Sequence, residues 1–194
     1  ADFALVVTPY YNKPSDEGIY RHFEAVSKVG VPIVVYNIQG RTGKNISVSL
    51  LKRIASLPNI IGVKEASGNI SQIAKVKLLC GDDVDLYSGN DDQVIPILSL
   101  GGIGVISVLS NVMPAATHDM VMEYLDGNIK SALDIQLKYL DFIEALFCEV
   151  NPIPVKAAMK LLGYDVGGLR LPLTELEDAN KVRLKECMEN LKDN

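Results

Sequence analysis

The sequence predicts an α/β fold built on a parallel β-sheet. Five short apolar runs alternate with helix-like segments, and their carboxyl ends fall at Thr8, Tyr36, Lys64, Ser88 and Ile106. These ends lie 28, 28, 24 and 18 residues apart, and strand–helix–strand units of that length join parallel strands. Near-equal units without a nucleotide-binding fingerprint favour a (β/α)8 barrel over a doubly wound sheet.

The predicted strands are short, rich in apolar residues and bounded by turn signals. They cover residues 3–8, 33–37, 60–64, 84–87 and 104–108. The third run is apolar until it reaches Lys64, and a polar turn from Ala66 to Asn69 follows it. A run of this kind is typical of a strand that is buried on both faces.

The first predicted helices begin at capping residues. Ser15, with Asp16 and Glu17 after it, caps a helix over residues 16–29, and Ser47 caps a helix that ends at Ser56. Further helices are predicted for residues 70–80, 91–99, 114–125, 128–148 and 152–162, with a last one beginning near Thr174. After the segment 114–125, which could close the strand–helix series, no strand separates the helices. The remainder indicates a helical extension.

The number of strands limits the architecture. A closed barrel of this kind needs eight strands and typically about 250 residues. The 194 residues supply five strands, so the chain is either an open five-stranded sheet or the C-terminal part of a barrel. A strand that begins at Phe3 with no start signal before it favours the second. We expect a partial barrel at residues 1–126 and a helical domain at residues 127–194.

Composition excludes several classes of function. The net charge is −5 and the Lys and Arg residues form no cluster, which makes nucleic-acid binding and a basic membrane patch poor interpretations. No signal-peptide pattern opens the sequence, and no apolar run approaches the roughly 20 residues that span a bilayer. Cys80, Cys148 and Cys187 are far apart and odd in number, so we expect reduced, buried thiols in a cytoplasmic protein. His22 and His118 have no second ligand at metal-binding spacing, so no metal is expected.

The residues at the predicted strand ends indicate a specific chemistry. Desolvation at a strand end would lower the pKa of Lys64, which leaves part of its amine neutral and nucleophilic, as imine formation with a ketone requires. In parallel barrels the active site lies at the carboxyl ends of the strands, where this sequence also places Tyr10, Tyr11, Tyr36 and Arg41. A phenol can relay protons and a guanidinium can clamp a carboxylate. Together these residues predict covalent imine catalysis on a small keto acid.

Each of these residues also has an ordinary structural interpretation. Lys64 could extend from a strand end to solvent. Tyr36 could be an amphipathic core residue, and Arg41 a solvated loop charge.

Three further patterns favour structure over chemistry. The glycines within residues 101–104 precede a strand instead of opening a helix, so they predict a tight turn and not a phosphate site. Asp91 and Asp92 are typical of a helix N-terminus. Residues 151–154 most simply end one helix and begin another.

Six motifs form a highly specific combination. They are Thr8-Pro9-Tyr10-Tyr11-Asn12, Tyr36-Asn37 with Gly40-Arg41-Thr42-Gly43, Gly62-Val63-Lys64-Glu65-Ala66, Ser88-Gly89-Asn90-Asp91, Gly104-Val105-Ile106-Ser107 and Asn151-Pro152-Ile153-Pro154-Val155-Lys156. On these residues the chain resembles the dihydrodipicolinate synthase family of pyruvate-dependent class I aldolases. The resemblance covers essentially the whole chain and corresponds to strands four to eight of the family's barrel, with its C-terminal helical domain.

The resemblance implies roles for the strand-end residues. Lys64 is similar to the lysine that forms the imine with pyruvate, and Tyr36 to the phenol that assists imine formation and proton transfer. Arg41 matches the arginine that holds the carboxylate of aspartate semialdehyde. Tyr11 resembles a tyrosine lent across a dimer interface to the neighbouring subunit's proton relay, and Tyr10 would stack at that interface, near where lysine inhibits some members.

The resemblance further implies that Gly89 and Ile106 line the pyruvate pocket, Ile106 through its backbone. Members condense pyruvate with L-aspartate 4-semialdehyde to 4-hydroxy-tetrahydrodipicolinate, on the diaminopimelate route to lysine. They are usually cytoplasmic homotetramers built as a dimer of dimers. No metal or organic cofactor is expected, because the covalent intermediate is a pyruvate imine on Lys64.

The sequence departs from the family in two ways. Gln39 stands where members usually have proline, so the loop that carries Arg41 would be less rigid. The family's first three strands, with two adjacent threonines that bind pyruvate and join the proton relay, have no counterpart here, so the 194-residue chain alone is predicted to have little or no synthase activity.

Two alternatives remain open. The first is a sibling aldolase acting on a sugar acid, such as an N-acetylneuraminate lyase, although the motif around Arg41 argues against it. The second is a non-catalytic chain that serves only in assembly.

Overall fold

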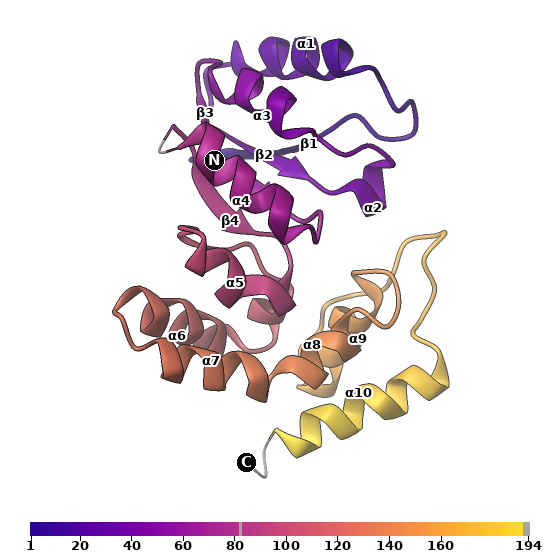
Figure 1. The fold of residues 1–194 in the computed structure, drawn as a ribbon. Coiled ribbons are helices and arrows are strands. Elements are labelled where there is room, and N and C mark those ends of the chain that lie inside the picture. Colours follow the sequence, from indigo (N-terminus) through magenta and orange to yellow (C-terminus); the bar gives the residue numbers. More distant parts are fainter. Residues whose placement is uncertain (82, 192–194) are drawn as a thin grey trace. The chain divides into compact units, whose positions relative to one another are not determined.

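A computed structural model describes residues 1–81 and 83–191. Contacts divide the chain into two compact units, Ala1–Ile106 and Ser107–Asn194, which are described one at a time (Figure 1). These units do not test the predicted division into residues 1–126 and 127–194, which stays a prediction.

The first unit is organised around a five-stranded parallel sheet. Its strands are hydrogen-bonded in chain order, from β1 at one edge to β5 at the other. They are β1 (Ala4–Val7), β2 (Ile33–Asn37), β3 (Ile60–Glu65), β4 (Asp85–Ser88) and β5 (Gly104–Val105). The predicted parallel βα series is therefore confirmed.

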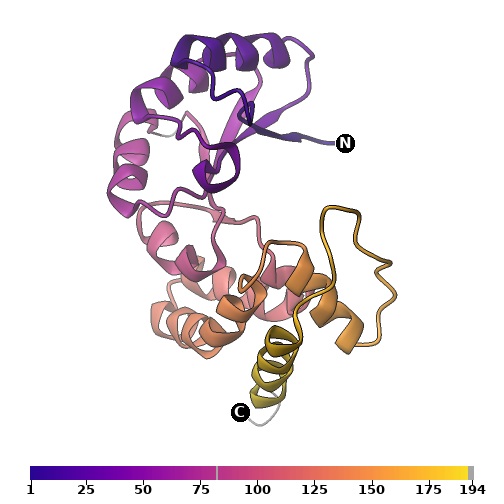
Figure 2. The same ribbon diagram turned by 90° about the vertical axis from the view of Figure 1, so that its right-hand side faces the viewer.

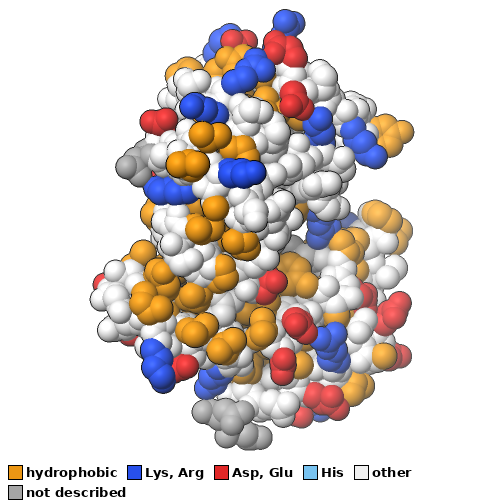
Figure 3. Space-filling view, viewed as in Figure 1, with side chains coloured by type: hydrophobic (Ala, Val, Ile, Leu, Met, Phe, Trp, Pro, Cys, Tyr) orange, Lys and Arg blue, Asp and Glu red, His pale blue; other side chains and the backbone are white. Residues whose placement is uncertain are grey.

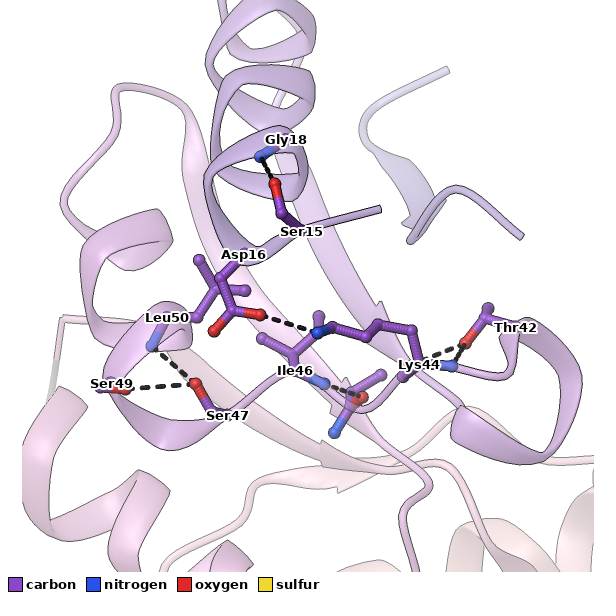
Figure 4. Close-up of polar contacts among 10 residues, drawn as sticks. Ser15, Asp16, Gly18, Thr42, Lys44, Ile46, Ser47, Ser49 and Leu50 are labelled. Carbon is purple, nitrogen blue, oxygen red and sulfur yellow. Dashed lines mark hydrogen bonds and ion pairs between the residues drawn. The ribbon is translucent and has the colours of Figure 1, made fainter. Parts of the chain in front are cut away.

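The helices of this unit lie between the strands in sequence. They are α1 (Asp16–Ser27), α2 (Gln39–Thr42), α3 (Val48–Ala55), α4 (Ile70–Cys80) and α5 (Val94–Ser99), with a 3-10 turn η1 (Asp91–Gln93) before α5. The two predicted caps are confirmed: Ser15 Oγ accepts the Gly18 N–H at 3.2 Å and Ser47 Oγ accepts the Leu50 N–H at 3.3 Å (Figure 4). The helical turn α2 was not predicted, because its four residues are too few to show a helical period.

The core of this unit lies between the sheet and α1, α3 and α4. Figure 2 shows these helices along one side of the strands. Phe23, Ile54 and Ile73 from the helices are fully buried against Val35 and Val63 from the central strands. Because side chains alternate across a strand, the residues next to Val35 and Val63 in sequence face the opposite side of the sheet.

All regular elements among the described residues of the second unit are helical, as predicted for the C-terminal part. Its elements are a 3-10 turn η2 (Leu109–Asn111) and the helices α6 (Pro114–Leu125), α7 (Ile129–Lys138), α8 (Leu140–Leu146), α9 (Ile153–Leu161) and α10 (Asp178–Asn190). The single helix predicted over residues 128–148 is wrong, because Tyr139, with φ −93° and ψ 0°, separates α7 from α8. The last helix begins at Asp178 and not near Thr174.

An apolar surface covers part of α6 and α7. Figure 3 shows hydrophobic side chains gathered there. The exposed apolar side chains of these two helices include Met122, Leu125, Ile129, Leu133 and Leu137, each at least 39% exposed.

Two remaining expectations concern membranes and thiols. None of the described helices is both long enough and apolar enough to cross a membrane. All three cysteines are free, but only Cys80 is buried; Cys148 and Cys187 are half-buried, so the expectation of buried thiols is right for one of the three.

Candidate active site

One row of the sheet places Lys64 between two tyrosines. Lys64 on β3 is in register with Tyr36 on β2 and with Tyr87 on β4, and each is the penultimate residue of its strand. All three therefore lie at the carboxyl edge, on the face of the sheet away from α1, α3 and α4. The sequence-based placement of Lys64 and Tyr36 at one edge is thus matched by the strand register.

The amine of Lys64 lies over the ring of Tyr36. Its Nζ is 4.1 Å from the ring centroid, and the residue is only 8% exposed. Burial lowers the pKa of Lys64 below that of an ordinary lysine, while the carboxylate of Asp91 acts in the opposite direction. A larger fraction of this amine is therefore neutral at a given pH than for a lysine in water.

The same buried surroundings shift the pKa of the Tyr36 phenol in the opposite direction. Burial raises its pKa, and the nearby guanidinium of Arg41 lowers it by a smaller amount. Tyr36 consequently keeps its proton near neutral pH and can donate it to an oxygen that develops negative charge beside Lys64.

The turn that carries Arg41 is held by several hydrogen bonds. The Gly43 N–H closes α2 on the Gln39 carbonyl at 2.8 Å, with Gly43 in the left-handed region at φ 70°. Thr42 Oγ1 donates to the Lys44 carbonyl, and Lys44 Nζ pairs with Asp16 Oδ1 at 2.9 Å (Figure 4). Arg41 itself is exposed at the end of this turn. The lower rigidity expected from Gln39 stays a prediction.

Gly89 and Ile106 bring their backbones to the same edge. The Gly89 N–H donates to the Glu65 carbonyl at 2.8 Å, and the Ile106 N–H donates to the Ser88 carbonyl at 2.9 Å. A Cβ on Gly89 would stand 2.7 Å from Ala66 Cβ and 3.1 Å from Lys64 Cε. The glycine is therefore required for the strand ends to approach each other beside Lys64.

Replacing Gly89 with alanine is expected to destabilise the chain. The added methyl group must displace Ala66 or Lys64, and overpacking of this kind costs about 1–3 kcal/mol. Urea unfolding measures the change. Gly40→Ala is the matched control, because a Cβ there meets nothing within 4 Å. Equal stability of the two variants would contradict the steric requirement.

Tyr10 and Tyr11 are not brought to Lys64 within this chain. They are 67% and 90% exposed in the loop after β1, and Tyr11 has a φ of 64°, which is uncommon outside glycine. Two exposed tyrosines in a strained loop are a feature of contact surfaces.

Two residues near the amine were missed as site residues. Tyr87 flanks Lys64 on the side opposite Tyr36, and Asp91 is the charge that favours the protonated amine. Burial raises the pKa of Tyr87, whose ring lies close to Gly62 and Gly104 of the neighbouring strands. The sequence contains a weak signal for Tyr87, since it stands directly before a strand end, as Tyr36 does.

The fold and site together define the class of protein. It is an α/β protein of parallel strands with a desolvated lysine at the carboxyl edge, beside a phenol and a guanidinium. The family model described as the dihydrodipicolinate synthetase family matches residues 1–191, and the chain belongs to this family.

Named relatives agree with this assignment. A Clostridium perfringens protein named 4-hydroxy-tetrahydrodipicolinate synthase is 51% identical over 195 residues, which cover 100% of this chain and 66% of the relative. A protein of Clostridium novyi with the same name is 53% identical over 190 residues, 97% of this chain and 64% of the relative. The chain thus spans just under two-thirds of the length of the curated relatives it matches.

Solved structures agree as well. The crystal structure of dihydrodipicolinate synthase from Aquifex aeolicus superposes with a TM-score of 0.96 at 40% identity, over 99% of this chain and 66% of that one. The Acinetobacter baumannii enzyme, described as chloride inhibited and complexed with pyruvate, gives a TM-score of 0.94 at 36% identity, with 99% and 66% covered. The predicted fold class is confirmed: the chain is part of a (β/α)8 barrel with a C-terminal helical segment.

Proposed function

We propose that Lys64 is the nucleophile of a pyruvate-dependent aldolase, and that the protein condenses pyruvate with L-aspartate 4-semialdehyde to give 4-hydroxy-tetrahydrodipicolinate. The observation that carries the proposal is the buried Nζ of Lys64, 4.1 Å from the ring centroid of Tyr36 at the carboxyl edge of the sheet. The names of the relatives support 4-hydroxy-tetrahydrodipicolinate as the product, and the Acinetobacter baumannii complex supports pyruvate as one substrate.

The reaction proceeds through an imine. The neutral amine of Lys64 attacks C2 of pyruvate, and Tyr36 supplies protons to the carbonyl oxygen until it leaves as water. Loss of a methyl proton gives an enamine, whose carbon forms a bond to the aldehyde carbon of the semialdehyde. The semialdehyde's own amine then attacks the imine carbon, which closes the ring and releases Lys64 as a free amine.

Other residues receive supporting roles in this proposal. Arg41 holds the carboxylate of the semialdehyde through its guanidinium. Gly89 and Ile106 line the pyruvate pocket with backbone atoms. Tyr11 completes the proton relay of a neighbouring subunit, with Tyr10 at that contact, which their exposure in one chain supports.

The proposal includes assembly and location. The intact protein is a cytoplasmic homotetramer, built as a dimer of dimers, and needs no metal or organic cofactor because the imine itself supplies the electron sink.

Reductive trapping and a turnover assay test the function. Borohydride added with pyruvate is expected to leave a carboxyethyl group on Lys64, which peptide mass spectrometry locates. Turnover of pyruvate with aspartate semialdehyde, but not cleavage of N-acetylneuraminate, distinguishes this function from that of a sugar-acid aldolase. Absence of the adduct at high pyruvate would refute the proposal.

A polypeptide limited to these 194 residues is proposed to trap pyruvate weakly and to turn over little. Its sheet has β1 and β5 as outer strands, and a site at the rim of such a sheet is only partly enclosed. Full turnover by the purified 194-residue polypeptide would contradict this proposal and leave the imine chemistry intact.

A further inference from the structure

A buried hydrogen-bonded pair lies directly behind the proposed catalytic residues. Asn37 follows Tyr36 on β2. Glu65 follows Lys64 on β3 and is in register with Asn37. Both side chains of this pair are fully buried, and Asn37 Nδ2 lies 3.1 Å from each carboxylate oxygen of Glu65. Because side chains alternate, the pair occupies the face of the sheet opposite the amine and the phenol.

The same amide also holds the loop that follows Arg41. Asn37 Nδ2 donates to Asn45 Oδ1 at 3.0 Å, and Asn37 Oδ1 accepts the Ile46 N–H at 3.0 Å. Asn45 and Gln72 exchange two hydrogen bonds of 2.8 and 3.2 Å at the start of α4. One network therefore connects the segment that carries Arg41 with β3 and α4.

The carboxylate of Glu65 fixes the turn after Lys64 as well. Its Oε1 accepts the Ser67 N–H at 2.8 Å. Burying a carboxylate and an amide costs free energy that an apolar pair of similar volume would not, so the pair is a poor device for stability alone. Its directional bonds do fix the relative position of two neighbouring strand ends.

We infer that Asn37 and Glu65 are positioning residues, which hold the strand ends so that the amine of Lys64 stays over the ring of Tyr36. The inference rests on the proposed function, since it assigns the pair to the imine chemistry of that site. A shift of about 1 Å in a reacting group can slow a reaction by about 10²-fold, which gives such positioning its value.

Glu65→Gln is the first variant that tests the inference. It keeps the shape of the side chain, but one of the two oxygens that accept from Asn37 Nδ2 becomes an NH2 group, which cannot accept that hydrogen bond. Imine formation with pyruvate is expected to slow by about tenfold or more. Quenching the reaction with borohydride at a series of times measures this rate.

The second variant exchanges the amide of Asn37 and the carboxylate of Glu65. In the double variant Asn37→Asp with Glu65→Gln, the amide and the carboxylate change places, so a hydrogen bond between the strands is restored. The rate of imine formation is expected to recover most of the loss. A folded double variant as slow as Glu65→Gln would overturn the inference.

Asn59→Asp is the matched control. This variant removes the amide donor of Asn59, whose Nδ2 donates to the Ser27 carbonyl at 2.9 Å. Asn59 directly precedes β3, so the lost hydrogen bond lies at the end of the strand away from Lys64. The variant is expected to lower the unfolding temperature without changing the rate of imine formation. A comparable loss of rate in this variant would show that general destabilisation accounts for the Glu65 result, and would overturn the inference.

A second readout does not depend on pyruvate. Acetic anhydride labels neutral lysine amines, and the pH midpoint for labelling Lys64, which burial lowers, is expected to rise in Glu65→Gln, because a loosened strand end admits water. Removal of a negative charge alone would lower that midpoint, so the direction identifies the cause. An unchanged or lower midpoint overturns the positioning role, whereas absence of the pyruvate adduct in the wild-type chain refutes only the proposed function.

Discussion

Replacing Lys64 with methionine is expected to abolish the borohydride-stable pyruvate adduct. Methionine is unbranched and apolar, so it can fill the buried space that the lysine stem occupies, but it offers no nucleophile. Burial lowers the pKa of Lys64 in the folded chain. At any pH below the pKa of Lys64 in the unfolded chain, the charged amine therefore destabilises the folded state, so loss of the amine should not reduce stability. Peptide mass spectrometry after trapping measures the adduct, and thermal unfolding measures the stability.

Lys75→Met provides the matched control for this loss. Lys75 is exposed on α4, and its replacement should leave the adduct at the wild-type level. An undiminished adduct on some other lysine of the Lys64→Met chain would mean that the nucleophile has been misassigned.

Tyr36→Phe is expected to slow imine formation by about 10²–10⁴-fold, the usual contribution of a positioned acid or base. The variant keeps the aromatic ring 4.1 Å beneath the Lys64 amine and removes only the hydroxyl. The adduct should still form at long reaction times, because the nucleophile is intact. Rapid-quench trapping separates the rate from the final amount.

Tyr87→Phe controls for loss of a phenol next to Lys64. Tyr87 occupies the neighbouring position on β4, and its ring packs near Gly62 and Gly104. Its hydroxyl has no role in the proposed proton transfer, so little change in rate is expected. Equal slowing in both variants would show that Tyr36 is not the specific proton donor.

Much of the sheet could be predicted because its signals are local. The apolar run before Tyr36 and the one before Lys64 are bounded by turn residues, and both strands appear within one residue of the expected limits. The fifth strand was predicted too long: β5 ends at Val105, and Ser107 Oγ caps a following turn by accepting the Ser110 N–H at 2.8 Å. A β-branched run predicts extended backbone, but a single side-chain hydrogen bond can override it.

The glycine-rich and proline-containing segments were interpreted correctly. Residues 100–103 form the turn between α5 and β5, with Gly101 at φ 86°, and Gly104 begins β5. Asp91 begins the 3-10 turn η1, and α9 begins at Ile153 after the Asn151–Pro152 pair. These signals are local restrictions on φ and on hydrogen bonding, so they survive in any tertiary context.

The candidate site was predictable only in part. The sequence places Lys64, Tyr36 and Arg41 at strand ends, but it does not contain the lateral register of the strands. That register decides that Tyr36 and Tyr87 flank the amine and that Asn37 faces Glu65. The exposure of Tyr11 likewise depends on the path of the loop after β1.

The sequence by itself determined the order of the five strands, their parallel arrangement, and the family likeness carried by motifs around Lys64. Only the tertiary structure decided how far the Lys64 amine is desolvated, which ring lies against it, and which buried pair lies on the opposite face of the sheet. The physical reason is that apolar periodicity and turn chemistry act between residues close in the chain. Desolvation and strand register instead depend on atoms from β2, β3 and β4, which are brought together by folding.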